Sequence, residues 1–303
     1  MKNALIVITA LLALSILGVV VLELVVSSHL DGGKGRVAVL AAWEVKPALT
    51  QIVERYEAET GRRVDVRFGT SRALLAQLKH SEEGDLFICA SERERARAVE
   101  EALVPRWAKR PLAYLVPAMI VRHNAPMDIV YSSDLVSEQA RLVIADPELD
   151  SMGRFAVELV ESVRDVRHFG AQARELVIAM PPSAPEAVEL VSLAKADAAI
   201  AWRVMQQWEP AFLGVKDFDP EEIPRVCRVS VGKTAFCRDV EAANDFLQYM
   251  AEPDTQAVLK KWGYITTRAD AQQAAPEATI GGEPAVPARW RHDAAHESAG
   301  VDE

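Results

Sequence analysis

Two short turns carry polar residues that are well placed to contact a small ligand. The first turn, at 41–44, ends in Glu44, and the second, at 68–71, contains Thr70 and Ser71. Each turn follows an apolar strand pattern and precedes an amphipathic helix pattern. The start of a helix has unpaired backbone N–H groups and the positive end of the helix dipole, which favour an anion or a small polar ligand. We therefore expect a binding site where the two turns meet.

The turns contain no grouping typical of covalent or metal catalysis. A Ser–His–Asp set, a Cys–His pair and a cluster with metal-ligand spacing are all missing from the turns of the sequence. Glu44 could act as a general base only with a second titratable group, for which Asp146 and Arg72 are weak candidates. We therefore expect no catalytic residues, no bound metal, no cofactor and no enzymatic activity.

Alternating strand and helix patterns must position these turns. The pattern starts at Arg36 and resumes at 142, after an apolar run at 112–121. Repeated strand–helix units predict parallel sheets that are covered by helices on both faces. Two units in sequence, with a return at the end, predict lobe one at 36–116 with 231–268 and lobe two at 117–230.

The first 35 residues contain a membrane segment and a linker. Residues 4–22 carry no charge, which is long enough for a helix that crosses a bilayer. A weak cleavage site follows at 26–28, so a removed signal peptide and a soluble periplasmic protein remain the alternative to an uncleaved anchor. Either interpretation predicts export, with the rest of the chain facing the periplasm or the extracellular side.

The composition of the chain argues against nucleic-acid binding and predicts a disordered segment at the C-terminal end. The chain has 303 residues and 34 basic against 44 acidic side chains, a net charge of −10, and no basic stripe, so we expect no nucleic-acid binding. Cys227 and Cys237 could pair in an oxidising compartment, but spacing alone does not decide this. Residues 269–303 are rich in Ala, Pro, Glu and Gly, which predicts a disordered tail.

Six short segments, in order and at suitable spacing, resemble the molybdate-binding receptors of bacterial ABC transporters. They are the two turns, the strand at 85–90, the Ala-Asp-Pro turn at 145–147 with Gly153, the strand at 196–202 and the segments 246–247 and 262–264. The resemblance covers about 36–268 and implies the type II periplasmic binding-protein fold. This is a two-lobed α/β fold in which each lobe is a mostly parallel sheet flanked by helices, here preceded by one N-terminal transmembrane helix.

The resemblance also implies the ligand-binding residues. Family members hold a tetrahedral dianion with hydroxyl and backbone N–H groups in a closed cleft. Carried over to this sequence, the site consists of Trp43, Glu44, Thr70, Ser71, Met152, Gly153, Ala184 and Trp202. Trp202 replaces the family's tyrosine, so it can donate a hydrogen bond but cannot accept one. Trp43 and Trp202 could instead face each other across the cleft and enclose a planar or cationic ligand.

Glu44 stands where the family has a hydroxyl side chain. A carboxylate about 4 Å from a dianion costs on the order of 8 kcal/mol at an effective dielectric constant of about 20. One interpretation is that Glu44 only caps the helix that starts near Pro47, where a negative charge is favourable. A second is that its carboxylate replaces the anion's charge, so that the cleft binds a cation, an amine or a neutral polar solute. A third is that the resemblance is shifted by one residue, which places Trp43 at this position.

These observations predict an extracytoplasmic solute-binding receptor of an ABC-type transporter, for molybdate or a related tetrahedral oxyanion. Its expected partners are the ligand, the transporter permease and the membrane, and the protein itself is expected to be a monomer. The alternative function is a membrane-tethered sensing or assembly module that has the same clamshell shape and binds a different small ligand.

Overall fold

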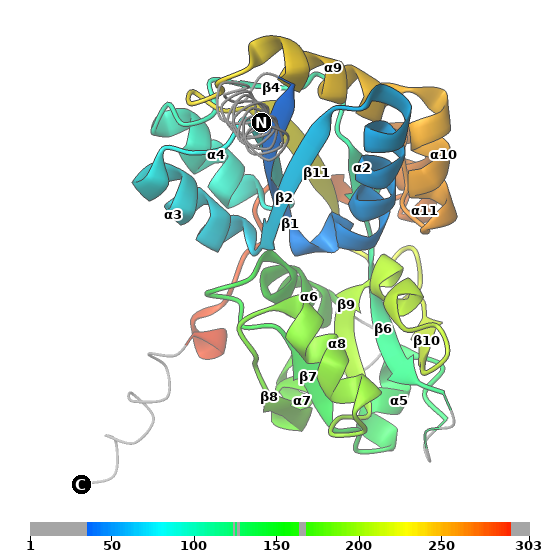
Figure 1. Cartoon of the computed structure of the whole chain (residues 1–303). Coiled ribbons are helices and arrows are strands. Elements are labelled where there is room, and N and C mark those ends of the chain that lie inside the picture. Colours follow the sequence, from blue (N-terminus) through cyan, green and yellow to red (C-terminus); the bar gives the residue numbers. More distant parts are fainter. Residues whose placement is uncertain (1–34, 124, 126–127, 164–167, 292–303) are drawn as a thin grey trace, which may run out of the picture.

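The computed structural model describes residues 35–123, 125, 128–163 and 168–291, which form two lobes stacked one above the other (Figure 1). Each lobe is built on one sheet that is flanked by helices. The expected membrane segment at 4–22 lies outside the described residues. Within them, no helix is long and apolar enough to cross a membrane.

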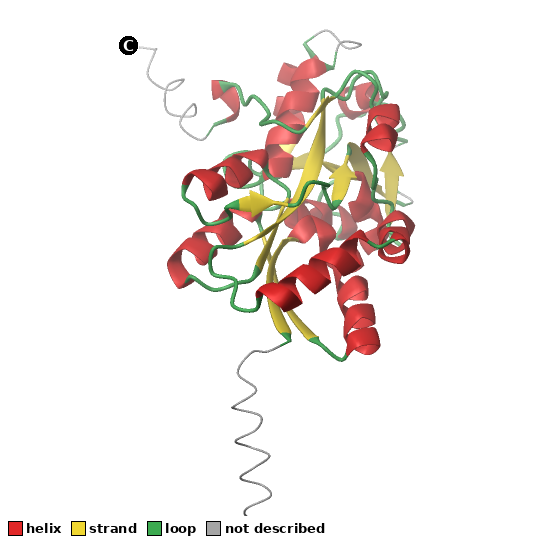
Figure 2. Ribbon diagram, turned by 90° about the horizontal axis from the view of Figure 1, so that it is seen from above, coloured by secondary structure: helices red, strands yellow, loops and turns green. Residues whose placement is uncertain are grey.

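Lobe one contains the sheet of order β12-β11-β3-β1-β2, with β4 and β5 also paired to β11. Helices lie on both faces of this sheet (Figure 2). The strands are β1 (Arg36–Ala42), β2 (Arg63–Gly69), β3 (Leu86–Cys89), β4 (Arg106–Trp107), β5 (Ala113–Leu115), β11 (Arg225–Lys233) and β12 (Thr279–Ile280). The helices are η1 (Trp43–Val45), α2 (Lys46–Thr60), α3 (Ser71–Ser81), α4 (Glu92–Glu100), α9 (Val240–Ala251), α10 (Pro253–Lys261) and α11 (Arg268–Ala274).

Lobe two contains the sheet of order β10-β6-β9-β7-β8. Its strands are β6 (Pro117–Arg122), β7 (Leu142–Ile144), β8 (Val177–Ala179), β9 (Ala198–Trp202) and β10 (Leu213–Lys216). Its helices are α5 (Ser132–Ser137), α6 (Ser151–Ser162), α7 (Phe169–Leu176), α8 (Ala184–Ser192) and η2 (Arg203–Trp208).

The strands that come from strand–helix repeats pair in parallel, as the sequence predicts. In lobe one β1 pairs in parallel with β2 and β3, and in lobe two β7 pairs in parallel with β8 and β9. The first strand after each passage between the lobes is antiparallel to the neighbouring strand of the strand–helix repeats in the sheet that it joins. Thus β11 is antiparallel to β3, and β6 is antiparallel to β9. Both sheets are therefore mixed, not mostly parallel.

The two passages between the lobes differ from the predicted boundaries in one place. The first lies at Val116, between β5 and β6, so the apolar run at 112–121 is two strands that belong to different sheets. The second lies in 217–224, because all of β11 pairs within the sheet of lobe one. The predicted return at 231 is therefore too late, since alternating apolar residues mark a strand but do not say which sheet it joins.

The C-terminal segment is ordered as far as Arg291, contrary to the predicted disordered tail. It forms α11, then β12, which pairs in parallel with β11, and then η3 (Ala288–Trp290) on lobe two. Trp290 is buried, and its indole N–H donates to Oε1 of Glu161 in α6 at 2.6 Å. Composition misled the prediction because a few well-placed residues, above all this tryptophan, anchor an otherwise polar segment. We call residues 281–291 the strap. It is a third passage between the lobes (Figure 1).

Candidate functional site

The lobe-one side of the candidate site is the turn after β1. The apolar strand β1 ends at Ala42, and the 3-10 turn η1 then places Glu44 inward, so that only 3% of this residue is exposed. Tyr264 donates its phenolic hydroxyl to the backbone carbonyl of Glu44 at 2.5 Å. Glu44 therefore does not turn outward. It does not cap α2 either, because that helix begins after Val45 without a side-chain cap.

Glu44 is held in surroundings that favour its neutral form. Burial is the largest effect and, with the negative charge of Asp150, raises the pKa of Glu44 from 4.5 to about 8. Its own backbone N–H and the indole of Trp202 oppose this rise. Oε2 of Glu44 has no hydrogen-bond partner among the described residues. A buried polar oxygen without a partner is costly, so this position can accept a donor from a ligand.

The lobe-two side is centred on Asp150, which caps the N-terminus of α6. The backbone N–H of Met152 donates to Oδ1 of Asp150 at 2.7 Å, and that of Ala184, at the start of α8, points to Oδ2 at 3.4 Å. Asp150 is 3% exposed, and burial raises its pKa to about 6. The two N–H groups and the charge of Arg154 oppose that rise, and Glu94 adds to it.

The backbone donors expected for an oxyanion near Met152 and Ala184 are thus bonded to a carboxylate of the chain itself. The hydroxyl residues of lobe one are also engaged. Thr70 caps α3 by accepting from the N–H of Ala73 at 3.2 Å, and Oγ of Ser71 accepts from the N–H of Ala90 at 3.1 Å. Each hydroxyl keeps a hydrogen that it can donate.

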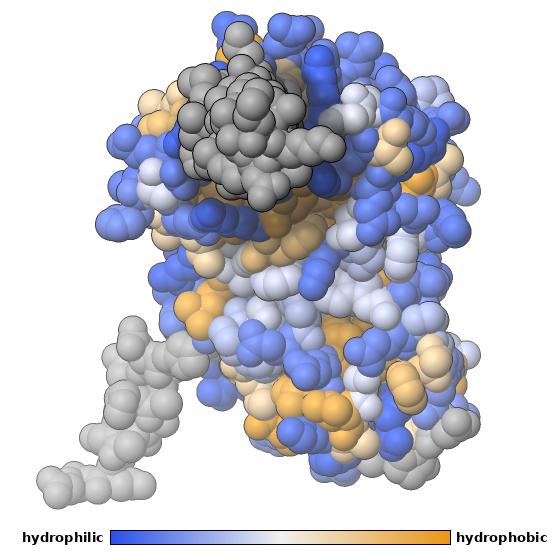
Figure 3. Space-filling view, viewed as in Figure 1, coloured by the Kyte–Doolittle hydropathy of each residue, from blue (hydrophilic) through white to orange (hydrophobic). Residues whose placement is uncertain are grey.

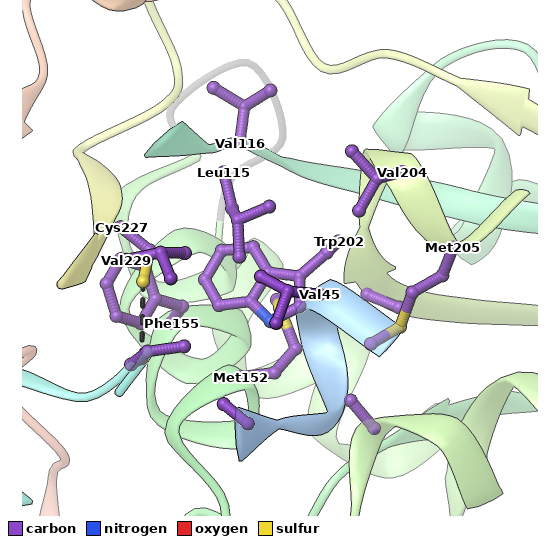
Figure 4. Packing of buried hydrophobic residues seen from close by; sticks show 14 of the residues in the cluster. Val45, Leu115, Val116, Met152, Phe155, Trp202, Val204, Met205, Cys227 and Val229 are labelled. Carbon is purple, nitrogen blue, oxygen red and sulfur yellow. Dashed lines mark hydrogen bonds between the residues drawn. The ribbon is translucent and has the colours of Figure 1, made fainter. Parts of the chain in front are cut away.

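The two tryptophans do not face each other. Trp43 stacks on Phe68 with ring centroids 6.0 Å apart, whereas Trp202 is fully buried and meets Phe155 edge-on at 4.9 Å. Figure 4 shows Trp202 between Val45 of lobe one and Met152 of lobe two, so it packs the junction between the lobes. Its indole Nε1 has no hydrogen-bond partner among the described residues.

The close packing of α6 against the end of β7 requires glycine at position 153, which the sequence alone does not reveal. A Cβ at this position would lie 2.2 Å from the backbone oxygen of Ala145 and 2.7 Å from the backbone nitrogen of Pro147. Only glycine lets the first turn of α6 approach the end of β7 so closely. This approach also brings the start of α6 to the junction between the lobes.

Contacts between the lobes surround these residues. Arg72 of α3 donates to the backbone carbonyl of Glu148 in lobe two at 2.6 Å. Arg154 of α6 is buried and pairs with Glu94 of α4 at 3.4 Å and with Glu283 of the strap at 2.5 Å. On the face shown in Figure 3, the surface is continuous across the boundary between the lobes.

A groove of about 800 Å³ lies between the lobes and is lined by residues of both. Three tryptophans from different elements line it, together with polar side chains, and Nζ of Lys46 lies 5.0 Å from the ring centre of Trp43. The groove residues used below are Trp43, Lys46, Ser183, Trp208 and Trp262. Trp43 directly precedes Glu44 and Ser183 directly precedes Ala184, so the groove adjoins both halves of the candidate site.

Sequence reasoning missed Asp150 and Arg154. Asp150 could have been found as an N-cap, because an aspartate before the apolar helix pattern at 151–162 is a helix-start signal. Arg154 gives no such signal, since a single arginine on a helix is usually exposed. Cys89, Cys227 and Cys237 are free thiols, so Cys227 and Cys237 do not pair in this structure.

Known proteins resemble this chain over most of its length. A relative from Haemophilus influenzae, described as a binding protein, is 22% identical over 229 residues, which are 74% of this chain and 88% of the relative. The sulfate-binding protein of Mycobacterium tuberculosis superposes with a TM-score of 0.68 and 16% identity, over 81% of this chain and 93% of that protein. The periplasmic molybdate-binding protein of Azotobacter vinelandii gives 0.63 and 16%, over 77% and 100%. The family model for bacterial extracellular solute-binding proteins matches residues 37–265. Given this match and the two-lobed fold, the chain belongs to the bacterial extracellular solute-binding protein family.

Proposed function

We propose that this protein is the receptor of an ABC-type transporter, which binds a small solute between its lobes and presents it to the permease. Family membership supports this role, as do the candidate residues, which come from both lobes and adjoin an interlobe groove. A ligand that contacts both lobes stabilises the closed form, and this is how a clamshell receptor signals that it is loaded. The proposed role is binding alone, without catalysis.

For the ligand, molybdate and related oxyanions fit the geometry less well than the alternative, a positively charged solute. Glu44 of lobe one and Asp150 of lobe two are both buried, and neither forms an ion pair among the described residues. An oxyanion placed here would meet carboxyl groups from both sides and would compete with Asp150 for the donors at Met152 and Ala184. The pair of buried carboxyls is the observation on which the proposal rests.

The groove suggests the shape of this solute. Trp43, Trp208 and Trp262 offer aromatic faces, which attract organic cations and pack against apolar groups. Lys46 already lies over Trp43, which shows that a cation can occupy that face. We propose a small organic amine or quaternary ammonium ion whose charged group points toward Glu44 and whose body lies in the groove.

The N-terminal segment would keep the receptor at the membrane surface. We propose that residues 4–22 act as an uncleaved anchor, because this run is uncharged and long enough to span a bilayer. Cleavage after 26–28 would give a soluble periplasmic receptor instead. Mass spectrometry of the mature protein from the native host distinguishes the two forms.

Isothermal titration calorimetry of the full-length protein in detergent tests the ligand class. Putrescine, choline and benzylamine serve as amine probes, with molybdate and sulfate as oxyanion probes. We expect at least one amine to bind, with an affinity that rises about tenfold or more from pH 6 to pH 8.5, because a cation binds the ionised form of Glu44.

The Glu44→Gln variant is the control, because it keeps the size of the side chain and removes its titration. This variant should bind the same amine weakly and without the rise with pH. Tight binding of molybdate or sulfate by the unmodified protein, with no response to amines, would show that the cationic ligand is wrong and that the oxyanion prediction is right.

A further inference from the structure

The N-termini of α6 and α8 converge on one carboxylate that belongs to the chain itself. Oδ1 of Asp150 accepts from Met152 at 2.7 Å, and Oδ2 lies 3.4 Å from the backbone nitrogen of Ala184. The helices are 12 and 9 residues long, and each begins with backbone N–H groups that lack a partner within the helix, although Pro185 of α8 contributes none. The dipoles of both helices place partial positive charge at this point.

Two convergent helix N-termini form a favourable position for an anion, whether it is a solute or a side chain. Asp150 supplies that anion from within the protein. Because it is the residue just before α6, its side chain reaches the donors of its own helix without strain and meets those of α8 on the other side. Its two oxygens thus engage both helices at once.

The groups that surround this carboxylate also point to a ligand position. The indole Nε1 of Trp202 is fully buried, and Oε2 of Glu44 belongs to a residue that is 3% exposed. Neither atom has a hydrogen-bond partner among the described residues. Asp150 acts on Glu44 through its charge, and the indole N–H of Trp202 is near enough to the Glu44 carboxyl to favour its charged form, although the two groups do not meet the geometry of a formed hydrogen bond. A donor and an acceptor that are buried and unpaired are what a bound solute would satisfy.

We propose that Asp150 is a built-in anion that sets the specificity of the site: it fills the position an oxyanion solute would take and thereby rejects oxyanions. This inference rests on the proposal that solutes bind at this junction. An incoming sulfate would have to displace Asp150 from both helices and then remain beside its negative charge. Asp150 is thus a specificity-determining residue, and its removal should convert the site to oxyanion binding.

Sulfate titration of full-length Asp150→Ser in detergent at pH 7.5 tests the proposal. Serine is a good N-cap, so α6 keeps a cap while the donor of Ala184 becomes free. We expect Asp150→Ser to bind sulfate at least about 100-fold more tightly than the unmodified protein, given the cost of a carboxylate beside a dianion. Asp150→Asn, which keeps the shape and removes only the charge, should show a smaller gain.

Glu148→Gln is the matched control. It removes one negative charge two residues before Asp150 but frees no donor of α6 or α8, so its sulfate affinity should stay unchanged. Near-UV circular dichroism and thermal melting show whether each variant is folded. A folded Asp150→Ser or Asp150→Asn that gains nothing over Glu148→Gln would overturn the proposal, and so would tight sulfate binding by the unmodified protein.

The same series separates this inference from the proposed amine ligand. A gain of sulfate binding in Asp150→Ser supports the role of Asp150 even if no amine binds the unmodified protein. Amine binding without any sulfate gain in the variants would leave the proposed function intact and exclude the built-in anion.

Discussion

At the scale of single residues, the junction between the lobes differs from an oxyanion site in its charge. Glu44 and Asp150 are buried carboxyls that approach from opposite lobes, and burial raises the pKa of both. A buried carboxyl without a cationic partner resists ionisation. The folded protein therefore holds protons that the unfolded chain has already lost, which links stability to pH.

Glu44 should make the folded protein less stable as the pH rises. Its pKa is about 8 in the folded state against a usual value of 4.5, so between these values the folded state binds more protons than the unfolded state. The free energy of unfolding then falls as the pH increases through this range. Between pH 5 and pH 8.5 the unmodified protein should lose at least about 2 kcal/mol more than Glu44→Gln, as measured by urea unfolding.

Asp150 remains in Glu44→Gln. Because its pKa is raised to about 6, it also lowers the free energy of unfolding as the pH rises, mostly below pH 6. The Glu44→Gln profile should therefore be flatter above pH 6 rather than flat throughout. Parallel profiles for the two proteins would mean that Glu44 is not held neutral in the folded state.

The sequence was sufficient to place some of these residues and insufficient for others. The sequence predicts that Glu44, Thr70 and Ser71 lie in turns between a strand and a helix. This follows from the order of the strand and helix patterns along the chain alone. The role of Asp150 could not be predicted in the same way. Its second contact depends on α8 lying beside α6, and that arrangement follows from the order of strands in the sheet.

At the scale of elements, α6 is the helix that joins the parts of the molecule. Its residue Arg154 pairs with Glu94 of α4 in lobe one and with Glu283 of the strap. One turn later, Glu158 accepts two hydrogen bonds at 2.8 Å from Arg225 of β11. The alternating strand and helix patterns of the sequence do not reveal that charged side chains of this helix bind the other lobe.

Removal of Arg154 should be costly because it leaves Glu94 buried without its partner. Arg154 is 4% exposed and Glu94 is 3% exposed. Breaking a buried ion pair from one side typically costs about 3–5 kcal/mol, so Arg154→Met should lower the free energy of unfolding by this amount. The double variant Arg154→Met with Glu94→Gln should recover a large part of the loss.

The exposed pair of Arg203 and Asp217 gives a matched comparison. Its side chains are 45% and 54% exposed, so Arg203→Met should cost less than about 1 kcal/mol. Equal losses for Arg154→Met and Arg203→Met in urea unfolding would show that the α4–α6 contact does not hold the lobes together.

At the scale of the whole molecule, the described part of the chain passes between the lobes three times. Two are continuous with strands, at Val116 and 217–224, and the third is the strap. The strap is fixed to lobe one through β12, and to lobe two where Arg289 and Trp290 bond to Glu161. Two passages allow a hinge, and a third restricts how far and how often it opens.

Loss of the strap anchor should increase opening. We expect the double variant Arg289→Ala with Trp290→Ala to exchange the backbone hydrogens of 151–155 at least about fivefold faster, because contacts with lobe one at Glu148 and Arg154 flank the start of this helix. Hydrogen–deuterium exchange followed by mass spectrometry measures this directly. Arg291→Ala is the control, since among the described residues its guanidinium donates to the carbonyl of Val286, which belongs to the strap itself. Unchanged exchange in the double variant would show that the strap does not restrain the hinge.

The strap also decides where mechanical load acts on this protein. The described chain enters lobe one at Arg36, the first residue of β1, and leaves from lobe two after Trp290. Without the strap, both ends would emerge from lobe one. With it, the two ends of the described chain lie on opposite lobes, so a force that pulls these ends apart also pulls the lobes apart.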